Sequence, residues 1–394
     1  MIQLSRRILN VKSSPTVALN AKAKALAKEG AKVLNFTVGE PDFPTPAAVV
    51  EKAVTALKAG RTKYGPAGGS PEFREAIAAK RARENGLHFP AADIVCGVGA
   101  KELLFHIFLA LLNEGDEVLV PSPYWVSYPD QILAAGAKPV FLPVSDNMGE
   151  APIRISDIER LATPRTVGII LNSPNNPAGY MFSEGLSREL GQYLSGKPWW
   201  IVSDEIYEYM AFDRPHVSIL AMFPGLKDRF IHVNGMSKGY AMTGWRVGYC
   251  AGPAPIMKMV RDLQSHSSTC LPPFIEEAAT FAISQGPTLL ANELATLKKR
   301  RDLAATLAAN IPGVSFAAPQ GAFYLFLHVR EALENGRTKL DSFAFAERLL
   351  MEHHMALVPG EAFGAPGFLR LSYATDENTI TEGMARLTSA LRNL

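Results

Sequence analysis

Between about residues 46 and 285 of this 394-residue chain, short β-rich runs alternate with helical stretches, and this alternation limits the possible folds most strongly. Helical spacing of apolar residues is clearest over residues 101–112. Alternation of this kind is typical of a mostly parallel sheet flanked by helices, so we predict an α/β fold with a seven-stranded sheet. The predicted strands cover residues 94–96, 117–120, 138–143, 167–171, 199–203, 229–233 and 247–251.

The pattern changes at both ends of the chain. Near the N-terminus, a helical pattern covers residues 17–29 and a short apolar run follows at 32–36. After residue 285, strands and helices no longer alternate simply, which favours a separate α+β unit. We therefore predict a large domain of residues 46–285 and a small domain of residues 1–45 and 286–394. In the C-terminal part we expect helices at 288–309 and 341–354, a helix at the chain end, and strands at 314–318, 322–329 and 368–373.

Composition excludes several classes of partner. Lys and Arg number 40 against 38 Asp and Glu, so charge favours neither nucleic acid nor a membrane surface. Three widely spaced cysteines do not make a disulfide framework and are typical of a reducing compartment. No apolar run reaches membrane-spanning length, and no signal-peptide pattern is present. We expect a cytoplasmic protein without a metal site, because the adjacent His353 and His354 lack metal-ligand spacing.

Polar residues and glycines follow five of the predicted strands. Ligands of open α/β sheets bind at the carboxyl ends of the strands, so these residues are expected to meet at one edge. They bring an amine, a carboxylate, amides, phenols, an indole and a glycine turn to that edge. The residues are Gly97, Gly99 and Ala100; Tyr124 and Trp125; Asn175 and Asn176; Asp204 and Tyr207; and Lys238.

These groups match the needs of a pyridoxal phosphate (PLP) site. Lys238 lies among small residues and is placed to hold the PLP aldehyde as a Schiff base, then to move the substrate α-proton. Asp204 is predicted to pair with the pyridine nitrogen, which lets the ring draw electrons from the substrate. Asn176 and Tyr207 are candidates to hydrogen-bond the ring hydroxyl. Trp125 is the candidate to stack on the ring, ahead of Tyr124.

Basic groups are available for the phosphate. The helix that opens at Gly99, Ala100 and Lys101 would present backbone N–H groups and its positive dipole end. Arg246, eight residues after Lys238, would add a bidentate clamp.

An arginine within an apolar strand indicates the substrate end. Alternation places Leu369, Leu371 and Tyr373 on one face and Arg370 on the other. A buried guanidinium needs an anionic partner, because an unpaired buried charge costs several kcal/mol. A substrate α-carboxylate would serve, and Gly39 would let the backbone approach it closely.

Several segments resemble a known family when taken in order. The chain resembles class I/II PLP-dependent aminotransferases of fold type I, close to the bacterial aspartate aminotransferase branch. The segments are VGEPDF (38–43), NSPNNPAG (172–179), SDEIYE (203–208), SKGYAMTGWRVGY (237–249) and RLSYA (370–374). The resemblance implies the roles given above and a homodimer in which Tyr64 reaches the neighbouring subunit's phosphate. Two positions depart from the usual pattern: Gly235 replaces a serine phosphate ligand, leaving Ser237 as a candidate contact, and Ala178 replaces a threonine.

The resemblance implies transfer of an amino group from an L-amino acid to a 2-oxo acid through a pyridoxamine form. Aspartate with 2-oxoglutarate is the preferred pair, with Thr16 as a candidate contact for the distal carboxylate. Aromatic amino acids, prephenate and alanine stay open, because the sequence does not identify a distal cation. A PLP-dependent C–S lyase and a non-catalytic ligand-binding module are the competing classes.

Overall fold

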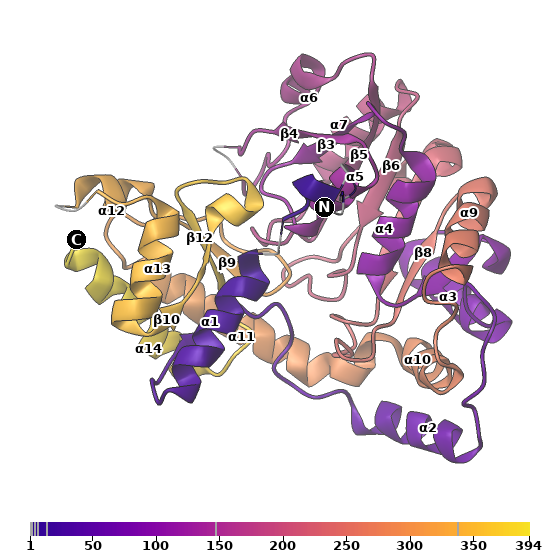
Figure 1. Cartoon of the computed structure of the whole chain (residues 1–394), viewed down its shortest axis with the longest axis horizontal. Helices are drawn as coiled ribbons and strands as arrows, with labels where there is room; N and C mark the ends of the chain where they lie inside the picture. Colours follow the sequence, from indigo (N-terminus) through magenta and orange to yellow (C-terminus); the bar gives the residue numbers. More distant parts are fainter. Residues whose placement is uncertain (1–2, 4, 6–7, 13–14, 146–147, 337–338) are drawn as a thin grey trace.

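The structure, a computed structural model, describes residues 3, 5, 8–12, 15–145, 148–336 and 339–394. Figure 1 shows a large twisted sheet with its helices beside a region of smaller sheets, with α11 (Ala291–Ala308) leading from one to the other. Among the described residues, none of the helices has both the length and the apolar character needed to cross a membrane.

The large sheet has seven strands in the order β2-β8-β7-β6-β5-β3-β4. The run from β7 to β4 is parallel, whereas β8 pairs antiparallel with both β2 and β7. The predicted mostly parallel, seven-stranded sheet is confirmed, and the predicted strand ends differ from the observed ones by at most two residues. The strands are β2 (Ile94–Gly97), β3 (Glu117–Pro121), β4 (Lys138–Leu142), β5 (Thr166–Asn172), β6 (Trp200–Asp204), β7 (Phe230–Gly235) and β8 (Gly248–Ala251).

Helices cover both faces of this sheet, which is why its central strands are apolar throughout. Alternate residues of β5 enter different cores: Ile169 and Leu171 pack on one face and Ile170 on the other. The face of Ile170 is covered by α4 (Ala100–Leu111), α5 (Ser127–Ala134) and α9 (Ala254–Ser265). The opposite face is covered by α3 (Pro71–Asn85), α7 (Glu184–Ser195) and α10 (Pro273–Gln285). The same core also contains buried residues of α2 (Ala47–Lys58), α6 (Ile155–Leu161) and α8 (Ile219–Met222).

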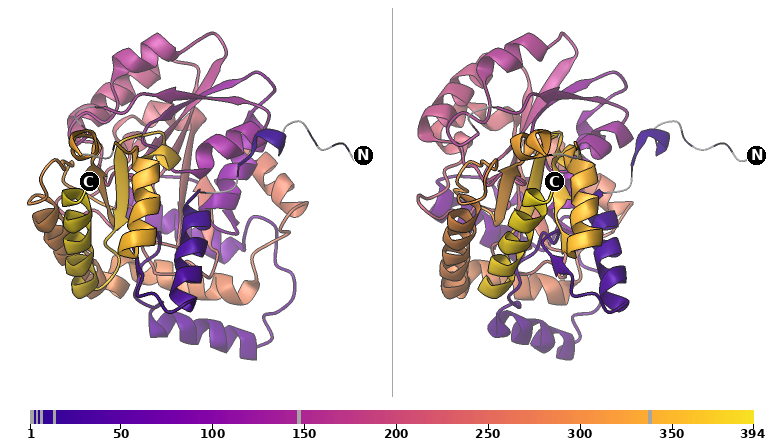
Figure 2. Two further views of the ribbon diagram at one scale, coloured as in Figure 1. Left: turned by 60° about the vertical axis from the view of Figure 1, so that its left-hand side comes forward. Right: turned by 90° about the vertical axis from the view of Figure 1, so that its left-hand side faces the viewer.

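Two small sheets form a second region, here called the small-sheet region. The antiparallel sheet has the order β11-β12-β9, and β1 pairs in parallel with β10. The chain's N-terminal part returns to this region, because Leu19 and Ala23 of α1 pack against Leu350 of α13 (Figure 2). Its strands are β1 (Leu34–Asn35), β9 (Tyr324–His328), β10 (Met355–Ala356), β11 (Val358–Pro359) and β12 (Phe368–Ser372), and its helices are α1 (Pro15–Lys28), α11, α12 (Arg330–Asn335), α13 (Ser342–His353) and α14 (Glu377–Arg392).

The predicted strand at 314–318 is wrong. Within these residues, all of which the structure describes, only Ser315 forms a β-bridge, to His328. Two backbone hydrogen bonds of 3.1 and 2.7 Å join this pair. The pairing does not extend because the following backbone turns toward another loop, where the Gln320 N–H donates to the Gly179 carbonyl (2.8 Å).

Candidate active site

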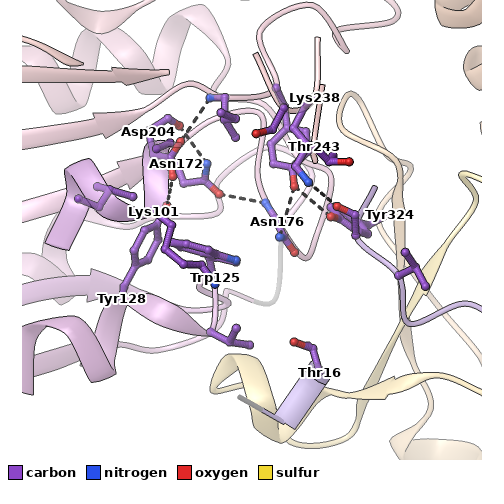
Figure 3. Close-up of a pocket in the computed structure, with 18 of the residues that line it drawn as sticks. Thr16, Lys101, Trp125, Tyr128, Asn172, Asn176, Asp204, Lys238, Thr243 and Tyr324 are labelled. Carbon is purple, nitrogen blue, oxygen red and sulfur yellow. Dashed lines mark hydrogen bonds between the residues drawn. The ribbon is translucent and has the colours of Figure 1, made fainter. Parts of the chain in front are cut away.

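A cavity of about 420 Å³ lies at the carboxyl ends of β5, β6 and β7, between the large sheet and the small-sheet region (Figure 3). The small-sheet region contributes Thr16, Tyr324 and Arg370 to its lining. The residues with a PLP or substrate contact predicted from the sequence line this cavity, except Gly99 and Tyr64. Three residues that were also expected at this edge are not part of the lining: Gly97, Tyr124 and Asn175. The topology therefore brings together residues that are far apart in the chain.

Lys238 lies just beyond β7 and points into the cavity (Figure 3). Its Nζ donates a hydrogen bond to the carbonyl oxygen of Gly39 and lies 5.7 Å from the centre of the Phe323 ring. Burial lowers the pKa of Lys238 to about 8, and the nearby cations Arg370 and Arg246 act in the same direction. A lysine with this pKa has a substantial neutral fraction near physiological pH, as an amine nucleophile requires.

Asp204 is the last residue of β6 and is 5% exposed. Its Oδ2 accepts a hydrogen bond from the hydroxyl of Tyr128 (2.7 Å), and its Oδ1 accepts one from the backbone N–H of Ile206 (3.3 Å). Burial raises the pKa of Asp204 to about 6, although the Tyr128 hydrogen bond opposes the rise. A carboxylate in this position is suited to a cationic partner such as a protonated ring nitrogen.

A chain of hydrogen bonds links the two sides of the cavity. The amide of Asn176 accepts from Nη1 of Arg370 (3.0 Å) and donates to the hydroxyl of Tyr207 (3.4 Å). The hydroxyls of Tyr207 and Tyr324 lie 2.9 Å apart. Gly39 packs closely against this chain of hydrogen bonds: a Cβ at this position would lie 2.9 Å from the Tyr324 hydroxyl. Close approach of the Gly39 backbone thus depends on the missing side chain.

Arg370 is only 3% exposed and has no carboxylate partner among the residues that the structure describes. Its Nη2 donates to the Thr37 carbonyl (2.8 Å), and its Nε has no hydrogen-bond partner in the described part of the chain. The guanidinium carbon lies 4.5 Å from the centre of the Tyr324 ring and 5.0 Å from that of Phe363. Burial lowers its pKa, so this cation is poorly compensated.

The predicted phosphate end lies at the start of α4. Gly99 caps this helix at φ +83°, and a Cβ there would lie 2.5 Å from Nη2 of Arg246. Arg246 donates to the carbonyls of Thr243 (3.0 Å) and Val98 (3.4 Å). Gly99 therefore does not line the cavity but makes room for the guanidinium that does. The arrangement fits a phosphate, because the N-terminal end of a helix and an arginine meet there.

Three important lining residues were not predicted as site residues. Tyr128 holds Asp204, Asn172 accepts the backbone N–H of Asn176 (2.9 Å), and Tyr324 contacts both Tyr207 and Arg370. Tyr128 follows Trp125 by three residues, a spacing that places both on one side of a helical turn. Tyr124, the alternative ring contact, instead stacks on Phe141 with ring centres 4.9 Å apart.

The two departures from the family pattern differ in their surroundings. At Gly235, a Cβ would lie 2.9 Å from the Val247 carbonyl oxygen, so this backbone has little space for serine. Ser237 lies in the cavity wall and is available to contact a ligand. Ala178 is buried and lies outside the cavity lining.

Tyr64 lies away from the cavity and is 88% exposed. It belongs to the loop between α2 and α3. Its side chain can therefore serve a PLP site only if that site belongs to another copy of the chain.

A lysine amine, a buried acid and a basic helix end at one sheet edge define a PLP-dependent enzyme of the α/β type. Residues 31–387 match the model of the family described as aminotransferase class I and II. The chain belongs to this family, and it is a PLP-dependent aminotransferase of fold type I.

Curated relatives match over nearly the whole chain. A probable aspartate/prephenate aminotransferase of Aquifex aeolicus is 41% identical over 396 residues, covering 99% of each chain. An aspartate aminotransferase of Geobacillus stearothermophilus is 40% identical and covers 98% of each.

Solved structures agree with the fold. The aspartate aminotransferase from Rhizobium meliloti superposes with a TM-score of 0.95 at 36% identity, covering 100% of both chains. The Thermus thermophilus aspartate aminotransferase with maleate gives 0.93 at 37% identity, covering 99% of this chain and 100% of that one.

Proposed function

We propose that this aminotransferase acts on dicarboxylic substrates, with aspartate as amino donor and 2-oxoglutarate as acceptor. The observation that carries the proposal is the charge of the cavity. Beside the Lys238 amine, the cavity lining carries three cations, Lys101, Arg246 and Arg370, and one carboxylate, Asp204. The phosphate of PLP supplies about two negative charges, which leaves cationic capacity for a substrate with carboxylates of its own.

The geometry supports the following proposed PLP contacts. Asp204 would hold the ring nitrogen, Asn176 and Tyr207 the ring hydroxyl, and Trp125 the ring face. The phosphate would bind to the N-terminal end of α4 and to basic or hydroxyl side chains around it. The proposed phosphate contacts are the backbone N–H groups of Gly99, Ala100 and Lys101 and the side chains of Ser237 and Arg246.

When bound, PLP supplies the electron sink that allows an amino acid to lose its α-proton. The chain's own residues orient the substrate and move that proton. Arg370 would bind the α-carboxylate and fix the Cα–H bond toward Lys238. Lys238, with its pKa lowered to about 8 by burial, would accept the proton and return it. The hydrogen bond from Arg370 to Asn176 ties the substrate anchor to the proposed ring contact.

Lys101 is the proposed contact for the distal carboxylate. Its Nζ lies 5.0 Å from the centre of the Trp125 ring and has no carboxylate partner among the described residues. Burial lowers its pKa, and Arg246 adds to this effect. Thr16, at the start of α1, lies on the opposite side of the cavity from Asp204 (Figure 3) and is the second proposed contact.

We also propose that the enzyme is a cytoplasmic homodimer in which Tyr64 contacts the phosphate of the other subunit. The 88% exposure of Tyr64 and its distance from its own cavity support this role. The division into residues 46–285 and residues 1–45 with 286–394 stays a prediction. An apolar cluster that contains Leu325, Leu349 and Leu387 of the small-sheet region supports it, whereas Phe326 and Phe363 pack in the large-sheet cluster.

A panel of amino donors with 2-oxoglutarate tests the proposed substrate. We expect kcat/KM to be highest for aspartate and glutamate, and Lys101→Met should raise KM for aspartate about tenfold, since a charged contact of ~1.5 kcal/mol is lost. The same variant should change KM for alanine less than twofold. An equal loss for both donors would contradict the role of Lys101.

Two further assays separate the alternatives. Prephenate as acceptor tests a second activity suggested by the name of the Aquifex relative. Incubation with an amino acid alone separates transamination from C–S lysis. An aminotransferase converts PLP once per site, whereas a lyase turns over and releases pyruvate and ammonia.

A further inference from the structure

A buried network of charged side chains lies behind the cavity. Lys80 and Arg81 of α3 are both fully buried, at 0% exposure. Arg81 reaches two carboxylates: Nη1 donates to Oε2 of Glu208 (2.8 Å) and Nη2 to Oε2 of Glu205 (3.4 Å). Lys80 donates to the other oxygen of Glu208 (2.5 Å). Burying two cations is costly unless each is paired, and here both are.

Each of the two carboxylates directly follows a residue that lines the cavity. Glu205 directly follows Asp204, and Glu208 directly follows Tyr207. Asp204 and Tyr207 line the cavity, whereas Glu205 and Glu208 do not. Arg81 therefore joins the two residues that come immediately after the proposed ring contacts.

The segment after β6 needs support from side chains. It forms turns in place of a helix, with the Glu208 N–H bonded to the Glu205 carbonyl (3.0 Å) and the Met210 N–H to the Tyr207 carbonyl (2.8 Å). Such short-range bonds do not fix the segment against α3. Side chains of α3 make that connection: Lys80, Arg81 and Asn85 bind Glu208, and Glu84 accepts a hydrogen bond from the hydroxyl of Tyr209 (2.6 Å). Among the described residues of α3, Arg81 alone also reaches Glu205.

Other donors complete the coordination of Glu205. The hydroxyls of Ser203 (2.9 Å) and Ser218 (2.6 Å) donate to its Oε1, and Nε2 of His232 lies 3.2 Å from its Oε2. Although burial acts against ionisation, His232 and His216 hold the pKa of Glu205 well below its usual value. The carboxylate is thus a charged acceptor in a fixed position.

We propose that Arg81 is a positioning residue for transamination: by joining Glu205 to Glu208, it fixes the turn that carries Asp204 and Tyr207. The inference rests on the roles proposed above for Asp204 and Tyr207. Arg81 itself does not line the cavity, so its effect must pass through that turn.

Arg81→Lys is the test variant, because lysine keeps the charge but cannot bridge two carboxylates with a planar fork. We expect the Kd of the apoprotein for PLP, measured by equilibrium dialysis, to rise about tenfold. We expect kcat per bound PLP to fall about 10- to 100-fold, as when residues that orient metal ligands are replaced. KM for aspartate should stay within twofold, because Arg370 lies on a different element.

Arg188→Lys is the matched control, since Arg188 makes an exposed ion pair with Glu184 on α7 (2.6 Å). It should leave Kd and kcat unchanged. The proposal is overturned if Arg81→Lys lowers the thermal midpoint while Kd for PLP and kcat per bound PLP stay within twofold of wild type.

Glu208→Gln, which keeps the size of the side chain, serves if Arg81→Lys does not fold. It should give the same pattern, and unchanged Kd and kcat in this variant would overturn the proposal equally. Asp204→Asn distinguishes a failure of the Arg81 proposal from a failure of the role proposed for Asp204. If Asp204→Asn retains full activity, the proposed role of Asp204 fails, whatever Arg81 does.

Discussion

At the scale of single residues, burial without an opposite charge distinguishes the candidate site from an ordinary ion-pair network. Arg370 and Lys238 are both cations whose pKa values are lowered by burial. By contrast, the fully buried Arg81 has carboxylate partners, and its pKa is raised. A cation left without such a partner in an otherwise well-paired interior indicates a place for an anionic ligand.

Replacing Arg370 tests this interpretation. Arg370→Ala should raise KM for every amino acid by at least roughly 30-fold, because about 2 kcal/mol is lost with a buried charged contact. The KM of Arg370→Lys should lie between those of wild type and Arg370→Ala, because lysine keeps the charge but lacks the bidentate fork. Steady-state kinetics with three different donors provide the measurement. If one donor alone suffered, Arg370 would be a side-chain selector and its proposed role would be wrong.

Site residues are predictable from the sequence where a single side chain has a distinctive chemistry. Lys238, Asp204 and Arg370 could be proposed because an amine or charge beside an apolar strand calls for a partner. Tyr324 could not, since a tyrosine in a strand is usually a core residue. Its place beside Arg370 depends on the pairing of β9 with β12, where Arg370 lies opposite Phe326 and Tyr324 opposite Ser372.

At the scale of elements, the strands of the large sheet were predictable because each is an apolar run bounded by turn residues. The segment 314–318 has a similar composition, but a strand also needs a partner along its length. Only Ser315 finds one, in His328. Which β-rich segments pair is decided by tertiary packing, which local pattern does not contain.

The start of α4 gives a prediction at the same scale. Gly99→Ala should displace the Arg246 guanidinium, because the new Cβ would lie 2.5 Å from Nη2. Losing a charge-assisted contact of about 1.5 kcal/mol should weaken PLP binding roughly tenfold. The measurement is titration of the apoprotein with PLP.

Gly115→Ala is the control for this prediction. Gly115 also has a positive φ, +88°, but its added Cβ would meet no described residue within 4 Å other than its chain neighbours. Both variants carry backbone strain, and only Gly99→Ala touches Arg246. Equal PLP affinity in the two variants would show that Gly99 has no role beyond its backbone conformation.

At the scale of the whole molecule, the site is proposed to depend on two subunits. The sequence carries Tyr64 in a glycine-rich loop, and the structure leaves it almost fully exposed. A contact within one chain can be distinguished from a contact between chains by placing one substitution in each subunit of a dimer.

Mixed dimers of Lys238→Ala and Tyr64→Ala chains supply that experiment. If Tyr64 acts on the other subunit, both defects fall in one site of the mixed dimer and the second site is intact. Mixed dimers, purified with two different tags, should then show about half of wild-type activity, whereas each parent dimer shows much less. If Tyr64 acts within its own chain, the mixed dimer contains no intact site and activity is not restored.

The central claim is that the ε-amino group of Lys238 forms the covalent attachment to PLP. It is tested by adding PLP to the apoprotein across a pH series, reducing with borohydride and mapping the modified peptides by mass spectrometry. The account predicts one modified residue, Lys238, with a rate of attachment that rises with pH around a midpoint near 8, because burial lowers the pKa from 10.5 to about 8. Modification of a different lysine, or no modification at all, would contradict it.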